Sequence, residues 1–270
     1  MKQLKLGKLV LPVYSVLALV YLLIPIAYTI AFSFNNSQGR TNTIWQGFTL
    51  EKWLHVCDRG DICGAVGTSL LIGGISTLVA TILGTAMAIA LVRYSFKARS
   101  LVSLSLFLPM ATPEIVMGAG LAGLFFNLGT GYGYTTVILA HIMFCLSFVV
   151  VTVKARVQTL DPVLEEAGRD LYANPTQVFW RITFPLLLPG IVSGALLSFA
   201  LSFDDFIITY FNAGGVVTTF PMYIYIAASK GVPAEANVIA SMVFFLAILF
   251  VLVSQVGTDI RRRRLAKASK

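Results

Sequence analysis

The chain has 270 residues, of which 57% are hydrophobic and only 12% are charged. Because soluble domains carry about 25% charged residues, this composition predicts an integral membrane protein and excludes an ordinary soluble domain. The formal net charge of +8 would suggest nucleic-acid binding in a soluble protein. In a membrane protein the positions of the basic residues matter more, and we expect membrane lipid rather than nucleic acid around the chain.

Apolar segments long enough to cross a bilayer recur along the chain. A helix needs about 20 mainly apolar residues to span the hydrocarbon core. The sequence therefore predicts an all-α membrane protein with six transmembrane helices. We expect a first span with its outer loop at 1–63, a main transmembrane domain at 64–257 and a basic tail at 258–270. The six predicted spans lie at about 10–33, 66–92, 101–126, 134–153, 186–210 and 237–257.

The lysines and arginines are distributed unevenly between the predicted loops. With the N-terminus inside, 16 of the 20 fall in segments on the inner side of the membrane and four on the outer side. Cytoplasmic loops of membrane proteins carry such an excess of Lys and Arg. The sequence therefore predicts a multi-pass protein with both termini in the cytoplasm.

Cys57 and Cys63 lie close together in the first predicted outer loop, beside His55 and Asp58. Their spacing matches no zinc pattern, so we expect no metal site. We expect two separate thiols, with a disulfide as the alternative on an oxidising face. The chain also lacks the G-x-x-x-x-G-K-[S/T] nucleotide-binding motif and any evident nucleophile–base arrangement. We therefore expect neither a cofactor nor an enzymatic activity in this chain.

A charged stretch, 161–185, interrupts the apolar pattern on the predicted cytoplasmic side, between the fourth and fifth spans. We call it the coupling insert. Asp161-Pro162 and Asn174-Pro175 each predict the start of a short helix, because Asp and Asn side chains cap free N–H groups and proline fits the first helical position. Pro185 is expected to end the second helix and begin the fifth span.

The first helix of the coupling insert is acidic at its start. Glu165 and Arg169 are spaced to form an i,i+4 ion pair. A solvated connector and an amphipathic helix resting in lipid headgroups are the alternatives to a protein-binding element. Headgroup helices are rich in Lys and Arg, and the inner leaflet is anionic. The acidic start therefore favours a protein partner.

The coupling insert resembles the E-A-A-x-x-x-G motif, with a later I-x-L-P, that marks the membrane subunits of bacterial ABC importers. In that family the two helices dock into a groove on the ATP-hydrolysing subunit and transmit its motion. The resemblance implies a type I ABC importer permease fold with this element between spans 4 and 5. The residues that carry the match are Glu165, Glu166, Ala167, Gly168, Asp170, Leu171, Tyr172, Ala173, Ile182 and Pro185.

Tyr172 departs from the motif, because it stands where the family has glycine. A positive φ at this position would cost a tyrosine on the order of 1 kcal/mol. We therefore expect a differently built turn, redirected by Asn174-Pro175.

Three acidic residues lie within the predicted spans, where a charge is costly and seldom accidental. Glu114 follows Pro113 in the third span, and Asp204 and Asp205 lie toward the outer end of the fifth. We expect these acids to line a pathway that attracts cations, with a hydrated or hydrogen-bonded structural role as the alternative. His141 is interpreted as a hydrogen-bonded helix partner rather than a proton relay.

Almost the whole chain resembles the permease family of spermidine/putrescine importers, of the PotC type. The segments IWQGFTLEKW, HIMFCLSFVVVTVKAR and GALLSFALSFDDFIITYF carry this resemblance, and Ser-Phe-Asp-Asp is its most specific part. Polyamines are flexible polycations, so intramembrane carboxylates suit them. Tyr210 is a candidate for a cation–π contact with substrate, and a membrane-belt aromatic is the alternative.

The resemblance implies a bacterial plasma-membrane assembly. Its expected partners are a second, different permease, an ATPase dimer that binds ATP and magnesium at the cytoplasmic face, and an extracytoplasmic substrate-binding protein. The alternatives are an importer of another small solute and, from a different class, a proton-driven transporter that uses Glu114, Asp204 and His141. A structural scaffold would leave the coupling insert and the buried acids unexplained.

Overall fold

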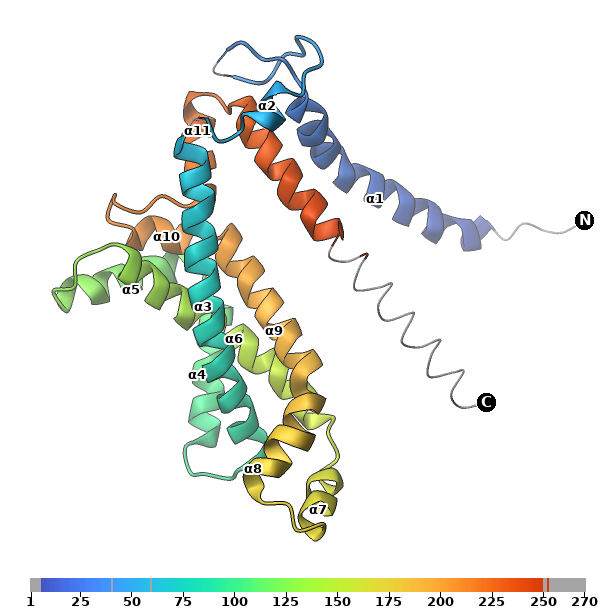
Figure 1. Cartoon of the computed structure of the whole chain (residues 1–270), viewed down its shortest axis with the longest axis vertical. Coiled ribbons are helices and arrows are strands. Elements are labelled where there is room, and N and C mark those ends of the chain that lie inside the picture. Colours follow the sequence, from blue (N-terminus) through green and yellow to red (C-terminus); the bar gives the residue numbers. More distant parts are fainter. Residues whose placement is uncertain (1–5, 40, 59, 250–251, 253–270) are drawn as a thin grey trace, which may run out of the picture. The chain divides into compact units, whose positions relative to one another are not determined.

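The computed structural model describes residues 6–39, 41–58, 60–249 and 252. Over these residues the fold is helical, apart from one isolated bridge between Asn35 and Phe48 (Figure 1). The helices are α1 (Leu6–Ser33), α2 (Glu51–Leu54), α3 (Gly60–Arg93), α4 (Arg99–Ala111), α5 (Glu114–Asn127), α6 (Tyr134–Gln158), α7 (Val163–Asp170), α8 (Pro175–Val178), the π-helical η1 (Phe179–Thr183), α9 (Phe184–Asp204), α10 (Ile207–Asn212), α11 (Phe220–Lys230) and a last apolar helix, Ala234–Leu249.

Contacts divide the chain into two compact units. One is Gly64–Tyr223, and the other combines Met1–Cys63 with Ile224–Lys270. The acids of the third and fifth predicted spans and the coupling insert all belong to the first of these units. We refer to it as the central unit.

Four of the predicted spans correspond to helices that are long and apolar enough to cross a membrane. Within the described residues these are Val10–Ser33, Gly60–Arg93, Tyr134–Gln158 and Pro175–Asp204. A fifth span is obtained if α4 and α5 are taken together. The structure therefore has four to five apolar spans by length and composition.

The third predicted span is not one straight helix. α4 and α5 meet at an angle of 112°. Thr112 between them is extended, with φ −82° and ψ 132°, because the residue before a proline disfavours the helical region. The break lies at Pro113, whereas Pro109 remains inside α4.

The fifth predicted span and the helix in the structure differ at both ends. The helix runs from Pro175 through η1 and α9 without a gap, so the prediction that Pro185 begins a new helix is wrong. The π-helical turn just before Pro185 lets the helix continue past a residue that has no N–H to donate. At the other end, α9 stops at Asp204, and the short helix α10 follows instead of continuing to residue 210.

The sixth predicted span is described only in part. Helix Ala234–Leu249 is apolar but shorter than the spans above. The remainder of 237–257, apart from residue 252, and the basic tail at 258–270 lie outside the described residues.

Helix α6 forms the centre of the central unit and packs along α9. The buried side chains on α6 include Val137, Val149 and Val153, which are completely inaccessible. A side chain at Gly190 of α9 would collide with α6, since its Cβ would lie 2.6 Å from Cβ of Arg156. This close approach lets the Arg156 Nε donate a hydrogen bond to the Leu186 carbonyl oxygen at 3.0 Å.

The loop between α1 and α3 is held by a disulfide. Cys57 and Cys63 are bonded, with their Cα atoms 5.4 Å apart, so the prediction of two separate thiols is wrong. The turn after α2 brings Cys57 back to the first turn of α3, which sequence spacing alone did not indicate. Lys52 in α2 also contacts Glu235, at 3.4 Å between Nζ and Oε1.

Candidate functional site

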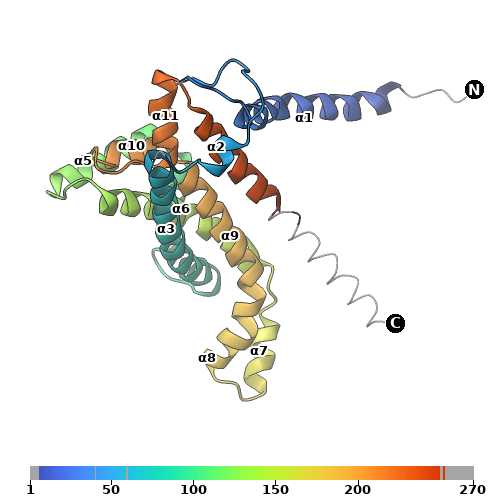
Figure 2. The ribbon, with the colours of Figure 1, turned by 45° about the horizontal axis from the view of Figure 1, so that its top comes forward.

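The three intramembrane acids lie at the breaks of two helices. Glu114 is the first residue of α5, Asp204 is the last residue of α9, and Asp205 lies between α9 and α10. Both views of the ribbon show α5 and α10 side by side (Figures 1 and 2). Glu114 interacts electrostatically with both aspartates. We call these three residues the acidic cluster.

Asp205 is buried, with 7% of its surface exposed. Its Oδ1 accepts a hydrogen bond from the Ile208 N–H at 3.2 Å, and its Oδ2 accepts one from the Thr209 N–H at 2.8 Å. The side chain therefore caps the start of α10. Its Oδ2 also lies 3.3 Å from Nε2 of His141. Asp205 thus connects α10 to α6.

His141 connects three elements through one imidazole. Its Nδ1 lies 2.7 Å from Oγ of Ser202 in α9, and its Nε2 lies 2.9 Å from Oγ1 of Thr209 in α10. The Thr209 hydroxyl donates its proton to Asp205 at 2.9 Å, so it accepts from Nε2 of His141. This arrangement agrees with the interpretation of His141 as a hydrogen-bonded helix partner.

Glu114 and Asp204 differ from Asp205 in being exposed. Asp204 is the last residue of α9, and the last carbonyl groups of a helix carry partial negative charge, whereas Glu114 is the first residue of α5. The sequence contains no Lys or Arg between residues 100 and 153 or between 182 and 229. A cation would therefore meet two accessible carboxylates and a helix C-terminus without a competing basic side chain.

A tight contact holds α5 against α10. A Cβ at Gly118 would lie 3.1 Å from the Phe211 ring and 3.4 Å from Cα of Ile208. The Asn212 Nδ2 donates to the carbonyl oxygens of Gly118 at 3.3 Å and Ile208 at 2.8 Å. This contact positions Glu114 relative to the aspartates.

The sequence reasoning missed the polar residues that support the acidic cluster. Ser202, Thr209 and Asn212 are buried and bond across helices. Their positions could have indicated this role, because hydrogen-bonding side chains within an apolar span usually contact neighbouring helices. Tyr210, which was predicted, is exposed on α10 beside Phe206 and Phe211.

The coupling insert forms two short helices, α7 and α8. Asp161 caps the first by accepting a hydrogen bond from the Val163 N–H at 3.0 Å. Asn174 caps the second, because its Oδ1 accepts from the Gln177 N–H at 2.8 Å while Gln177 Oε1 accepts from the Asn174 N–H at 3.0 Å. The predicted starts of both helices are confirmed to within one or two residues.

Tyr172 adopts the positive φ that its motif position requires. Its φ is 62°, so the expectation of a differently built turn is wrong. The side chain is 98% exposed, which lets this residue take the left-handed conformation without a clash against neighbouring elements. Asn174 starts α8 but does not replace the turn at Tyr172.

The predicted ion pair within α7 does not form. Glu165 instead contacts Arg93 at the end of α3, with 3.0 Å between Oε1 and Nη2. Gly168 is buried against η1 and α8, where a Cβ would lie 2.6 Å from Cδ1 of Ile182 and 3.4 Å from Cγ2 of Val178. The exposed members of the predicted set are Glu166, Ala167, Asp170, Leu171, Tyr172 and Pro185, whereas Ala173 and Ile182 are half-buried.

Helices α7 and α8 lie near one end of α9, and α10 lies near its other end (Figure 1). The segment 175–204 connects the coupling insert to the acidic cluster directly, because it begins in α8 of the insert and ends at Asp204. The insert and Asp204 are therefore parts of one continuous helical segment.

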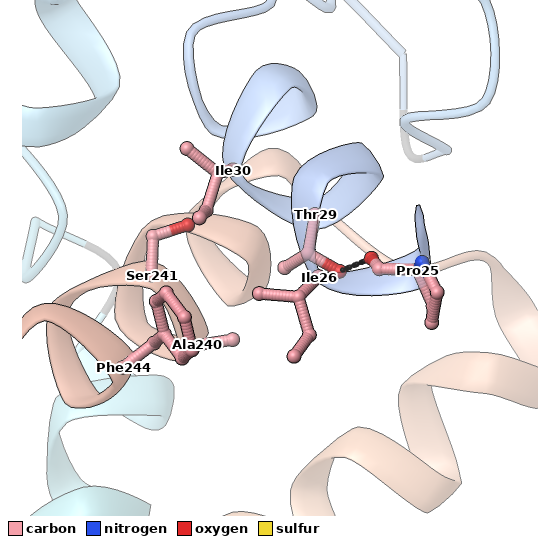
Figure 3. Close-up of a pocket in the computed structure, with 7 residues that line it drawn as sticks. All are labelled: Pro25, Ile26, Thr29, Ile30, Ala240, Ser241 and Phe244. Carbon is pink, nitrogen blue, oxygen red and sulfur yellow. Dashed lines mark hydrogen bonds between the residues drawn. The ribbon is translucent and has the colours of Figure 1, made fainter. Parts of the chain in front are cut away.

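A crevice of about 280 Å³ occurs in the other unit, between α1 and the helix Ala234–Leu249 (Figure 3). Its lining is apolar except for the hydroxyls of Thr29 and Ser241. The Thr29 hydroxyl donates to the Pro25 carbonyl oxygen at 3.0 Å. Because no charged side chain faces this crevice, it does not resemble a site for an ionic solute.

Comparison with known proteins identifies a family match over most of the chain. Residues 80–267 match the model of the binding-protein-dependent transport system inner membrane component. The spermidine/putrescine transport system permease protein PotC of Escherichia coli K12 is 37% identical over 87% of this chain and 88% of its own. The putrescine transport system permease protein PotI of the same organism is 35% identical over 86% and 84%.

A solved structure shares the fold at low identity. It is a bacterial ABC transporter involved in the import of the acidic polysaccharide alginate. One chain of that transporter superimposes with a TM-score of 0.68 at 15% identity and covers 96% of this chain and 98% of its own length. The all-helical arrangement is therefore that of an ABC importer permease.

Proposed function

Because this chain belongs to the family of binding-protein-dependent transport system inner membrane components, we propose that it is the permease subunit of an ATP-driven importer of polyamines. Spermidine and putrescine are the proposed substrates, as in the names of its relatives. The subunit forms part of the translocation pathway and performs no covalent chemistry, since the ATPase of such transporters is a separate subunit.

The observation that supports this proposal is the acidic cluster. Glu114 and Asp204 are exposed, lie within range of each other's electrostatic influence, and are free of basic neighbours in the sequence. A polyamine carries several ammonium groups separated by methylene chains, and each can bind one carboxylate. An anionic cargo would instead need basic side chains in the spans. The exposed ring of Tyr210, on the same short helix that Asp205 caps, is the proposed cation–π partner.

The coupling insert is the proposed contact with the ATPase. The exposed surface of the insert includes Glu166, Asp170 and Leu171. These side chains are available to dock into a groove of a partner protein. ATP binding closes the ATPase dimer, moves the inserts together and opens the pathway outward, and hydrolysis returns it to the inward-open state. ATP and magnesium are bound by the ATPase in this proposal.

The remaining features of the assembly follow from the same proposal. The chain has six spans in the type I arrangement, with both termini in the cytoplasm of a bacterium. Its transmembrane domain is 64–257, flanked by 1–63 and by the tail 258–270. A second, homologous permease completes the pathway, and an extracytoplasmic binding protein delivers the substrate. The apolar side chains of α1 are largely exposed, which fits a helix that contacts lipid or the second permease.

A proton-driven transporter is not supported by the family match. Its members work with a separate binding protein, as the family's description states. The imidazole of His141 is also surrounded by hydroxyl and carboxylate partners inside the protein, as expected of a structural connection.

Co-purification tests the proposed assembly. The chain is tagged at its C-terminus and extracted from its native membranes in a mild detergent, and the attached proteins are identified by mass spectrometry. We expect a P-loop ATPase and a second multi-span permease. A chain that is purified alone, in a detergent that preserves known transporter assemblies, would contradict the proposal.

A further inference from the structure

The two adjacent glutamates of α7 have different surroundings. Glu165 is half-buried, and its carboxylate lies 3.0 Å from Nη2 of Arg93. Glu166 is exposed. Successive residues of a helix point about 100° apart, so Glu165 faces Arg93 of α3 while Glu166 remains exposed. A single motif therefore contains two carboxylates with different neighbours.

Arg93 lies in the last turn of α3, 72 residues before Glu165. Only 18% of its side chain is exposed, and 20% of that of Glu165. The same Nη2 also approaches the carbonyl oxygen of Leu160 at 3.5 Å, in the link between α6 and α7. A partly buried, charge-assisted hydrogen bond is stronger than an exposed one and less screened by salt. One guanidinium thus contacts Glu165 of the coupling insert and Leu160, the residue just before the insert.

The other attachment of α7 is apolar and involves a different helix. Gly168 packs against Ile182 of η1 and Val178 of α8, which both belong to the segment that continues into α9. This contact fixes α7 to the start of the 175–204 helix but gives it no connection to α3. The contact between Arg93 and Glu165 supplies that connection.

We propose that Arg93 is a positioning residue for coupling, and that its ion pair with Glu165 transmits movement of the coupling insert to α3. The inference rests on the proposed function of the chain as an ABC importer permease. Glu166, on the outward side, is left to contact the ATPase. Without the ion pair, α7 loses its direct contact with α3, and movement of the insert reaches α3 only indirectly, through the packing of Gly73 of α3 against Phe199 of α9.

A charge exchange tests this proposal in the purified importer complex, with spermidine transported per ATP hydrolysed as the readout. We expect R93E and E165R each to lower this ratio about fivefold or more, without loss of the assembled complex in size-exclusion chromatography. The double variant R93E/E165R restores the ion pair with opposite polarity and should recover at least half of the wild-type ratio. The control is R93E/E51R, at a glutamate exposed on α2 with no role in the coupling insert, which should remain as low as R93E.

Hydrogen exchange of residues 163–170 provides a second readout that does not depend on transport. R93Q and E165Q should both make these amides exchange faster, whereas E51Q, at an exposed glutamate outside the insert, should not. These neutral variants also replace the charge-reversed ones if the latter fail to assemble. If the wild-type complex shows no ATP-dependent uptake, the proposed function is refuted. The hydrogen-exchange rates still test whether the ion pair between Arg93 and Glu165 holds α7 in place.

Two results would overturn the inference. If E165R lowers the ratio and R93E/E165R fails to restore it in an assembled complex, Glu165 acts on a partner chain rather than on Arg93. If R93E and R93Q leave both the ratio and the exchange rates unchanged, the ion pair does not position the insert.

Discussion

Adjacent aspartates at the end of α9 should respond oppositely to the same substitution. Asp204→Ala removes an exposed carboxylate, whereas Asp205→Ala removes a buried one that caps α10. We expect the first variant to retain its stability and lose transport. The second should lose stability.

The cost at Asp205 can be calculated from its contacts. Its oxygens accept from the N–H groups of Ile208 and Thr209 and from the Thr209 hydroxyl, and Oδ2 lies 3.3 Å from Nε2 of His141. Loss of a helix cap costs about 0.5–2 kcal/mol. Each buried donor left without a partner costs about 1–3 kcal/mol. The cap and the Thr209 hydroxyl together give about 1.5–5 kcal/mol. Because removal of one member of a buried pair costs about 3–5 kcal/mol, we expect the upper part of that range. An exposed side chain such as Asp204 changes stability by about 0.5 kcal/mol or less.

Thermal unfolding of the detergent-solubilised complex measures the difference. For a domain of 150–250 residues, 1 kcal/mol corresponds to about 2–4 °C in Tm, so Asp205→Ala should lower Tm by about 6 °C or more. Asp204→Ala should stay within about 2 °C of wild type. Equal Tm values for the two variants would refute the reasoning, because they would show that the network around His141 does not stabilise α10.

Three further substitutions test other features. Glu114→Gln should raise the spermidine concentration for half-maximal uptake about tenfold, since a hydrogen bond to a charged group contributes about 1.5–3 kcal/mol; an unchanged value would exclude Glu114 from the substrate route. Tyr172→Gly should stabilise the assembled complex by about 1 kcal/mol in thermal unfolding, because glycine adopts positive φ freely, and a loss of assembly would show that Tyr172 makes contacts with a partner. Cys57→Ser with Cys63→Ser should lower thermal stability by about 2 kcal/mol, and a reductant should destabilise the wild type but not this variant.

The spans could be predicted from the sequence because long apolar runs leave few alternatives. The breaks were harder to place. Pro113 interrupts the third span because its neighbour Thr112 becomes extended, but Pro109 and Pro185 both lie within continuous helix. Proline alone therefore does not determine where a membrane helix ends. The end of α9 at Asp204 depends on Asp205, whose side chain accepts a hydrogen bond from the Thr209 N–H and so caps α10.

The identities of the acidic residues could be predicted, but their separate roles could not. Asp204 and Asp205 are equivalent in sequence terms, and burial distinguishes them only once the helix has broken between them. The supporting residue His141 lies 61 positions from Ser202 and 68 from Thr209. No local pattern relates positions so far apart in one chain.

The coupling insert illustrates the same distinction. Capping chemistry at Asp161 and Asn174 is local, and both helix starts were predicted correctly. The ion pair of Glu165 was assigned to Arg169 by helical spacing, whereas the structure pairs it with Arg93 from another helix. Local rules gave the elements, and tertiary contacts decided which side chains meet.

ATP-dependent uptake of labelled spermidine tests the central claim most directly. The complex purified through this chain is reconstituted into lipid vesicles with its binding protein, and uptake is measured with and without ATP and with a protonophore. The proposal predicts uptake that requires ATP, is insensitive to the protonophore and is lost in the Asp204→Asn variant. Uptake that proceeds without ATP and collapses with the protonophore would contradict it.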